Sequence, residues 1–149
     1  MSAIQAEDRS TGALAGVKQT GGALHVTGSG GAFAPSTPYS SAALEGSAVL
    51  KASAGMFRSL YVQLDPALAA GTYYVQLLTA SATVPADGAV THLRPPQTIV
   101  HALGQAEGVN FDEGIAGIAF TVGCTAGVSS TRFTKTLVAA SALFAGSVL

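Results

Sequence analysis

Short apolar segments separated by glycine and proline turns constrain the fold of this chain most strongly, and they run from Ser47 to the C-terminus. They recur about every 8 to 14 residues, and none carries the sustained apolar stripe of an amphipathic helix. Regular short strands with such turns are typical of antiparallel sandwiches and jelly rolls. The sequence therefore predicts an all-β, jelly-roll-like antiparallel β-sandwich domain over residues 47–149.

Side-chain alternation supports two of the predicted strands in particular. Along residues 57–64, leucine and valine occupy one face, whereas Tyr61 and Gln63 occupy the other. Residues 72–78 are apolar on both faces, which predicts a strand that is buried on both sides.

The C-terminal part contains two further segments of interest. Residues 131–138 are predicted to form a strand with Phe133 and Leu137 pointing inward, and residues 142–148 fit either a strand or a short helix. The remaining predicted strands are residues 48–52, 90–94, 98–103, 108–112 and 117–123.

Residues 1–46 have a different composition, rich in glycine, alanine and serine, with no long apolar pattern. Such a segment buries too little apolar surface to offset its ordering entropy alone. It is therefore either a linker or an extended N-terminal arm that becomes ordered on a neighbouring subunit. In the second case we expect Leu24, Val26 and Tyr39 to make contacts with that neighbour.

The low charge of the chain limits its function class. Lysine and arginine number 7, aspartate and glutamate 8, and the formal net charge is −1. Scattered basic residues argue against nucleic-acid binding, which needs a basic cluster. The most apolar stretch, 137–149, is too short for a membrane-spanning helix, and the first residues lack the pattern of a signal peptide. A surface with so few charges is better suited to packing against other proteins.

The three histidines, His25, His92 and His101, are candidate metal ligands. His92 and His101 lie on successive predicted strands, so they could form a cross-strand pair that Asp87 or Glu107 would complete. His25 lies far away in the N-terminal segment. Single histidines on half-exposed strands explain the pattern more simply, so we predict no metal site and no cofactor.

No residue pattern indicates catalysis. Cys124 has no histidine nearby in sequence, and we expect it to be a buried, unreactive thiol. Asp112 and Glu113 are interpreted as part of a loop rim rather than an acid–base pair. An enzyme would need a cleft that unites at least two of His92, His101, Asp112 and Glu113. We therefore expect a non-enzymatic protein.

Tyrosines are the best candidates for contact residues in the β-rich part. Tyr61 and Tyr74 share their strand faces with glutamines, and tyrosines on exposed sheet faces form protein contacts or stack on sugar rings. The absence of tryptophan weighs against a sugar-binding platform.

Several short motifs in residues 53–136 occur in a recognisable order. They are SAGMFRSLYV (53–62), YVQL (74–77), VPADGAV (84–90), VNFD (109–112), GIAGIA (114–119) and TRFTKT (131–136). This order resembles small β-rich virion proteins of tailed bacteriophages. The sequence departs from that pattern at Leu78 and Thr79, where the second strand usually carries an aspartate. The resemblance implies no catalytic residue.

The resemblance implies a structural part of a virion. We expect a capsid decoration (cement) protein that packs against the major capsid protein or other virion proteins. We also expect it to form a homo-oligomer, and a trimer is one option for its size. The alternative is a neck, tail or fibre component, including a module that binds a host glycan.

Overall fold

A computed structural model of the chain describes residues 5–7, 14–20, 23–26, 36–80 and 83–149, with side chains from residue 36 onward. The chain divides into two compact units, Met1–Ala34 and Pro35–Leu149. In the first unit, β1 (Gln5–Glu7), β2 (Leu14–Thr20) and β3 (Ala23–Val26) form an antiparallel sheet in the order β1-β2-β3. The segment expected to be an extended arm thus contains a small sheet.

The second unit consists of strands and turns, and none of its described residues is helical. Its strands are β4 (Thr37–Ser40), β5 (Ser47–Lys51), β6 (Gly55–Leu64), β7 (Gly71–Thr79), β8 (Gly88–Ala89), β9 (Gln97–His101), β10 (Gly108–Asp112), β11 (Ile118–Phe120), β12 (Cys124–Ser129), β13 (Thr134–Lys135) and β14 (Ala142–Val148). The predicted all-β class is therefore confirmed.

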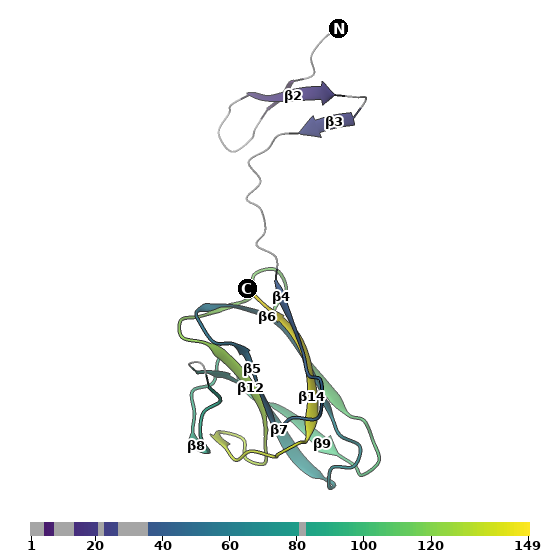
Figure 1. Cartoon of the computed structure of the whole chain (residues 1–149), viewed down its shortest axis with the longest axis vertical. Helices are drawn as coiled ribbons and strands as arrows, with labels where there is room; N and C mark the ends of the chain where they lie inside the picture. The colour runs from purple at the N-terminus through teal and green to yellow at the C-terminus, as the bar shows by residue number, and fades with distance from the viewer. Residues whose placement is uncertain (1–4, 8–13, 21–22, 27–35, 81–82) are drawn as a thin grey trace. The chain divides into compact units, whose positions relative to one another are not determined.

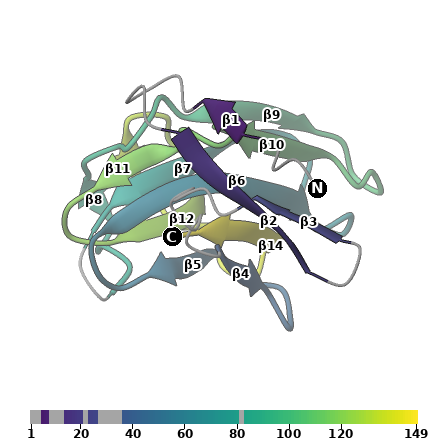
Figure 2. The same cartoon turned by 90° about the horizontal axis from the view of Figure 1, so that it is seen from above.

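Two antiparallel sheets make up most of this unit, and we name each after its longest strand. The β6 sheet has the order β10-β6-β14-β4, and β11 also pairs with β6. The β7 sheet has the order β5-β12-β7-β9, and a separate two-stranded sheet joins β8 to β13. Figure 1 shows β4, β6 and β14 on one side of the unit and β5 and β12 on the other. Figure 2 shows β10 and β11 lying along β6.

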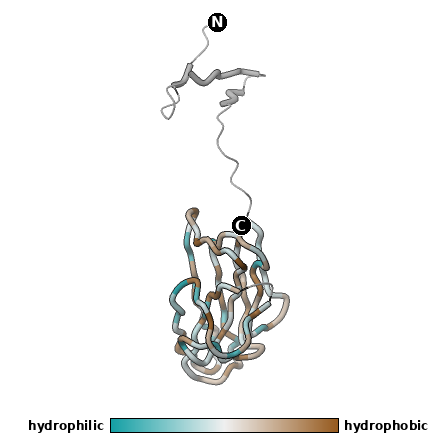
Figure 3. The backbone as a smooth tube through the Cα atoms, turned by 90° about the vertical axis from the view of Figure 1, so that its left-hand side faces the viewer, coloured by the Kyte–Doolittle hydropathy of each residue, from teal (hydrophilic) through white to brown (hydrophobic). Residues whose placement is uncertain are grey.

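One hydrophobic core joins the two sheets. Phe57, Phe111 and Phe144 contribute large, fully buried side chains from the β6 sheet. The β7 sheet contributes smaller residues such as Val75 and Ala126. Burial of each large side chain contributes about 1.5–3 kcal/mol. Hydrophilic positions are few and scattered along this unit (Figure 3).

Most of the predicted strands are present. Leucine and valine of β6 face the core while Tyr61 is exposed, as expected. The four residues 75–78 of β7 are all buried, which confirms a strand covered on both faces. Residues 142–148 form a strand rather than a helix.

The structure differs from the sequence interpretation in the region after residue 120. Residues 124–129 form β12, at the centre of the β7 sheet, although no strand was predicted there. The predicted strand 131–138 is reduced to the two residues of β13. Phe133 and Leu137 are exposed rather than inward-facing, so that prediction was wrong. The charged Lys135 takes the buried position instead.

The boundary between the two parts of the chain also lies earlier than residue 46. Strand β4 pairs with β14, with Thr37 opposite Val148, and Glu45 forms a bridge to Ala142. Residues 37–46 therefore belong to the compact second unit, which begins at Pro35.

Candidate functional site

The outer faces of the two sheets differ in what covers them. Gln76, Leu78, Thr125 and Ser129 alternate with core residues of the β7 sheet, and they are at most 1% exposed. The chain itself covers this face, because residues 130–138 fold back over it and bond to Gln76 and Ser129. The outer face of the β6 sheet has no such cover within the described residues.

We call the outer face of the β6 sheet the open face. Its side chains alternate with the core residues of four strands, and almost all of them are uncharged. Its residues are Pro38, Ser40, Ser59, Tyr61, Gln63, Gly108, Asn110, Asp112, Leu143, Ala145 and Ser147. Asp112, at the end of β10, is the one ionisable group apart from the tyrosine hydroxyl.

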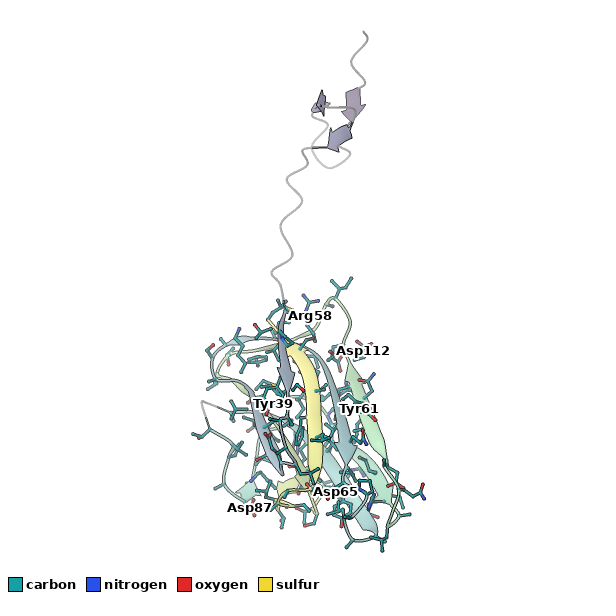
Figure 4. The ribbon with its side chains drawn as sticks, turned by 45° about the vertical axis from the view of Figure 1, so that its right-hand side comes forward. Tyr39, Arg58, Tyr61, Asp65, Asp87 and Asp112 are labelled. Carbon is teal, nitrogen blue, oxygen red and sulfur yellow. The ribbon has the colours of Figure 1, made fainter. Side chains whose placement is uncertain are left out.

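Tyr61 lies at the middle of the open face. It is directly opposite Ala145 on one side and Asn110 on the other, and it is 45% exposed. A side chain added at Gly108 would come within 2.7 Å of the Tyr61 hydroxyl, so the ring leans over this glycine. Figure 4 labels Tyr61 on this side of the unit. Small neighbours thus leave one face of a large aromatic ring accessible.

The other predicted contact residues do not join Tyr61. Tyr39 packs against the core, and its hydroxyl donates a hydrogen bond to Glu45 Oε2 at 3.0 Å. Burial and the Glu45 carboxylate raise the pKa of Tyr39 above its usual value. Tyr74 is half-buried on the other sheet, opposite Thr98 and Ser129. The side chains of Leu24 and Val26, on β3, lie outside the described residues.

His92 and His101, the possible cross-strand pair, do not form a ligand set. His101 is fully buried, with Nδ1 bonded to the Glu107 carboxylate and Nε2 3.0 Å from the Leu68 carbonyl oxygen. Its two ring nitrogens thus fasten β9 to neighbouring loops. His92 lies elsewhere, on a bridge to Leu78, and burial lowers its pKa. Among residues 36–80 and 83–149, no three His, Cys, Asp or Glu side chains are grouped as metal ligands.

Glu113 and Cys124, two further titratable candidates, also have structural roles. Glu113 forms an ion pair with Arg94, whose guanidinium carbon lies 5.1 Å from the centre of the Phe111 ring. Cys124 is fully buried in the core, and this burial raises its pKa to about 12. In the described part of the chain, no hydrogen bond or ion pair links two of His92, His101, Asp112 and Glu113.

A feature that sequence reasoning missed is the loop of residues 129–136, which we call the 129–136 loop. The buried amide of Gln76 donates to the carbonyl oxygens of Thr131, Arg132 and Thr134 at 2.9–3.1 Å. Ser129 Oγ accepts the backbone N–H groups of Thr131 and Thr136. The one sequence signal that could have revealed this buried polar anchor is the position of Gln76, a glutamine between apolar residues of a strand.

Lys135 extends this anchoring to the β8–β13 pair. It is 4% exposed and donates to Asp87 Oδ1 at 2.8 Å, and the same carboxylate accepts the backbone N–H of Leu137. The hydrogen bond from Lys135 lowers the pKa of Asp87. Two sets of bonds therefore hold the 129–136 loop. The Gln76 amide bonds to its backbone carbonyl groups, and the Asp87 carboxylate bonds to Lys135 near its end.

None of the described residues forms a helix that is long and apolar enough to cross a membrane. No family model matches the chain, and no curated protein or solved structure matches it either.

Proposed function

We propose that this chain is a non-enzymatic structural protein of a tailed-bacteriophage virion, and specifically a capsid decoration (cement) protein. In this proposal the unit Pro35–Leu149 is a jelly-roll-like β-sandwich that packs through its open face against copies of itself and against other virion proteins. The open face carries the proposal, because it is a solvent-facing sheet surface with one carboxylate at its margin and Tyr61 at its centre.

The physical argument concerns desolvation. A sheet face that stays in water normally carries charged and strongly polar side chains. Burying such groups costs free energy unless each finds a partner. The open face offers serine, alanine, asparagine and leucine side chains beside a tyrosine, so a protein partner can cover it at little cost. Tyrosine is also one of the residues most often found at energetic centres of interfaces.

The size of the face indicates how it would work. Four strands about 4.8 Å apart and about six residues of each strand give a face of roughly 400 Å². A stable pairwise interface usually buries about 800 Å² per partner. One such contact is therefore weak alone, and many copies on a repeating shell would provide the strength through avidity. The N-terminal unit would add contacts to a neighbour by strand addition.

Two measurements test this proposal. Immunogold labelling with antibodies against the chain should mark the heads of the phage whose genome encodes it. Purified chain added to heads that lack it should bind them and raise their disruption temperature. Unlabelled particles would contradict the virion assignment, and labelled necks or tails would move the protein to the alternative location.

Matched variants test the role of the open face. Tyr61→Lys and Leu143→Lys each place a charge on this face and should reduce binding to heads at least about tenfold. Thr98→Lys, at an exposed position of the other sheet, is the control and should bind normally. Equal binding by all three variants would show that the open face is not the contact surface.

A second candidate function is recognition of a host glycan by a neck, tail or fibre component. The observation in its favour is the accessible ring of Tyr61 next to the amide side chains of Gln63 and Asn110, since aromatic rings stack on sugars and amides bond to hydroxyls. Specific glycan-array binding that Tyr61→Ala abolishes, without any effect of the chain on head stability, would favour this function.

A further inference from the structure

The second unit has two exposed charges that lack an ion-pair partner, and they have opposite signs. Arg132 is the one exposed basic residue among residues 36–80 and 83–149, since the other lysines and arginines of these ranges are buried or half-buried. In the same ranges the exposed acidic residues are Asp87 and Asp112, and Asp87 is paired with Lys135. Asp112 is therefore the exposed acidic residue of these ranges that has no ion-pair partner.

Each of these two charges has an exposed apolar side chain within three residues in the sequence. Phe133, next to Arg132, is 68% exposed, and the Arg132 guanidinium carbon lies 5.1 Å from the centre of its ring. Ile115, three residues after Asp112, is 75% exposed. Aromatic and arginine side chains together are typical of the residues that dominate protein interfaces.

The loops that carry these residues are fixed by internal bonds. The Gln76 amide and the Ser129 hydroxyl hold the 129–136 loop, as described above. In the other loop, residues 112–117, Asp112 Oδ1 accepts the Gly114 N–H at 2.9 Å, and Arg58 donates to the Gly114 carbonyl oxygen at 3.3 Å. Prior fixation lowers the entropy cost of binding, which favours a loop as a contact site.

The two loops lie toward opposite ends of the unit. Asp112 is seen near the end that Arg58 occupies, whereas Asp87, which is bonded to Lys135 of the 129–136 loop, is at the other end (Figure 4). A single copy therefore cannot bring Arg132 to its own Asp112. Two copies aligned end to end can.

We propose that the 129–136 loop of one copy docks on the 112–117 loop of the next copy, pairing Arg132 with Asp112 and Phe133 with Ile115. This inference deepens the proposed assembly role and rests on it. The contact joins two different surfaces, so repetition produces a ring if the rotation closes and an open row if it does not. An exposed ion pair is screened by salt, so this contact weakens as ionic strength rises.

Charge reversal on the full-length chain tests the docking. Arg132→Glu and Asp112→Arg each place like charges across the contact, and each should weaken self-association at least about tenfold in sedimentation velocity at low salt. Thr98→Glu, at an exposed position outside both loops, is the control and should associate like the wild type.

Mixing the two variants gives the sharper result. In an equimolar mixture, Glu at position 132 meets Arg at position 112, and the unchanged Arg132 of one variant meets the unchanged Asp112 of the other. Alternating copies should therefore restore association in an open row or in a ring with an even number of copies, which a folding defect cannot do. The doubly reversed variant should also associate.

Three outcomes would overturn the inference: a wild type that stays monomeric at all concentrations, single variants that associate normally, or a mixture and a doubly reversed variant that both stay dissociated. If another protein of the particle rather than a second copy covers these loops, the wild type is monomeric in solution and the inference fails. If one of these outcomes occurs while the wild type still binds heads, the docking alone is refuted. Absence of the chain from particles refutes the proposed function.

Discussion

Replacement of Gln76 by leucine isolates the contribution of one buried amide to the 129–136 loop. The substitution keeps the side-chain size similar but removes the donor that three carbonyl oxygens share. Thr134 O keeps bonds from the hydroxyls of Ser129 and Thr131. The carbonyl oxygens of Thr131 and Arg132 lose the one hydrogen bond that they accept within the described residues.

The expected magnitude follows from these bonds. Each buried acceptor left without a partner costs about 1–3 kcal/mol, and water reaches part of this surface loop. The variant also removes Gln76 Oε1, a buried atom with no partner of its own, which offsets part of the loss. We therefore expect the free energy of unfolding to fall by about 2–3 kcal/mol.

Urea denaturation of the wild type, Gln76→Leu and Gln63→Leu measures this effect. Gln63 is half-buried on the open face, and its side chain forms no hydrogen bond with the described residues, so Gln63→Leu should change stability by less than about 0.5 kcal/mol. Faster amide exchange at Ser130 and Thr136 in the Gln76 variant would locate the change. If both variants lose the same free energy with the same m value, the anchoring role assigned to Gln76 is wrong.

Further predictions concern single side chains. The bond from Lys135 lowers the pKa of Asp87 below 3.8, so the ion pair stabilises the fold at neutral pH and this stabilisation disappears as the pH falls below that value. Asp87→Asn should therefore be less stable than the wild type at neutral pH and equally stable in strong acid, as measured by urea denaturation across pH. Burial raises the pKa of Cys124 to about 12, so iodoacetamide should alkylate it in urea and leave the native protein unmodified at mildly alkaline pH. Gly146→Ala should lower the free energy of unfolding by about 2–3 kcal/mol, because its Cβ would lie 2.4 Å from Ser59 O on β6, whereas Gly71→Ala meets only ordinary contacts and serves as the control.

The sequence predicted best where a strand follows the two-residue period with large side chains. In β6 the alternation of leucine and valine with Tyr61 identified both the core face and the exposed face. In β7 two apolar faces predicted burial on both sides. These signals are local, because the polarity of each side chain indicates whether its own position is buried or exposed.

The sequence was least informative where small or polar residues are buried by distant parts of the chain. Strand β12 has Cys124, Gly127 and Ser129 in place of large branched residues, and it becomes a central strand through its two neighbours. In the 129–136 loop, Gln76 draws the backbone carbonyls inward, which leaves Phe133 exposed although its spacing suggested a core position. The local pattern does not show the neighbouring strands of β12, and it does not show that Gln76 bonds to the 129–136 loop.

The candidate contact surface was predicted only in part. The alternation placed Tyr61 on the exposed face of its strand, but Leu143 and Ala145 come beside it only because β14 pairs with β6. Tyr39 turns inward because β4 adds to the same sheet. Pairings between residues far apart in the chain determine which side chains share a face, and periodicity does not encode them.

Strand β14 lies between β6 and β4. The backbone N–H of Phe144, on β14, donates a hydrogen bond to the hydroxyl of Ser41, which is 103 residues earlier in the chain. Contacts this remote in sequence form late, because a long loop must close before they contribute energy. A partly folded chain would leave one edge of β6 unpaired, and such edges recruit strands from other molecules. The risk of misassembly is thus greatest before residues 142–148 take their place, and a peptide of that sequence should slow aggregation during refolding.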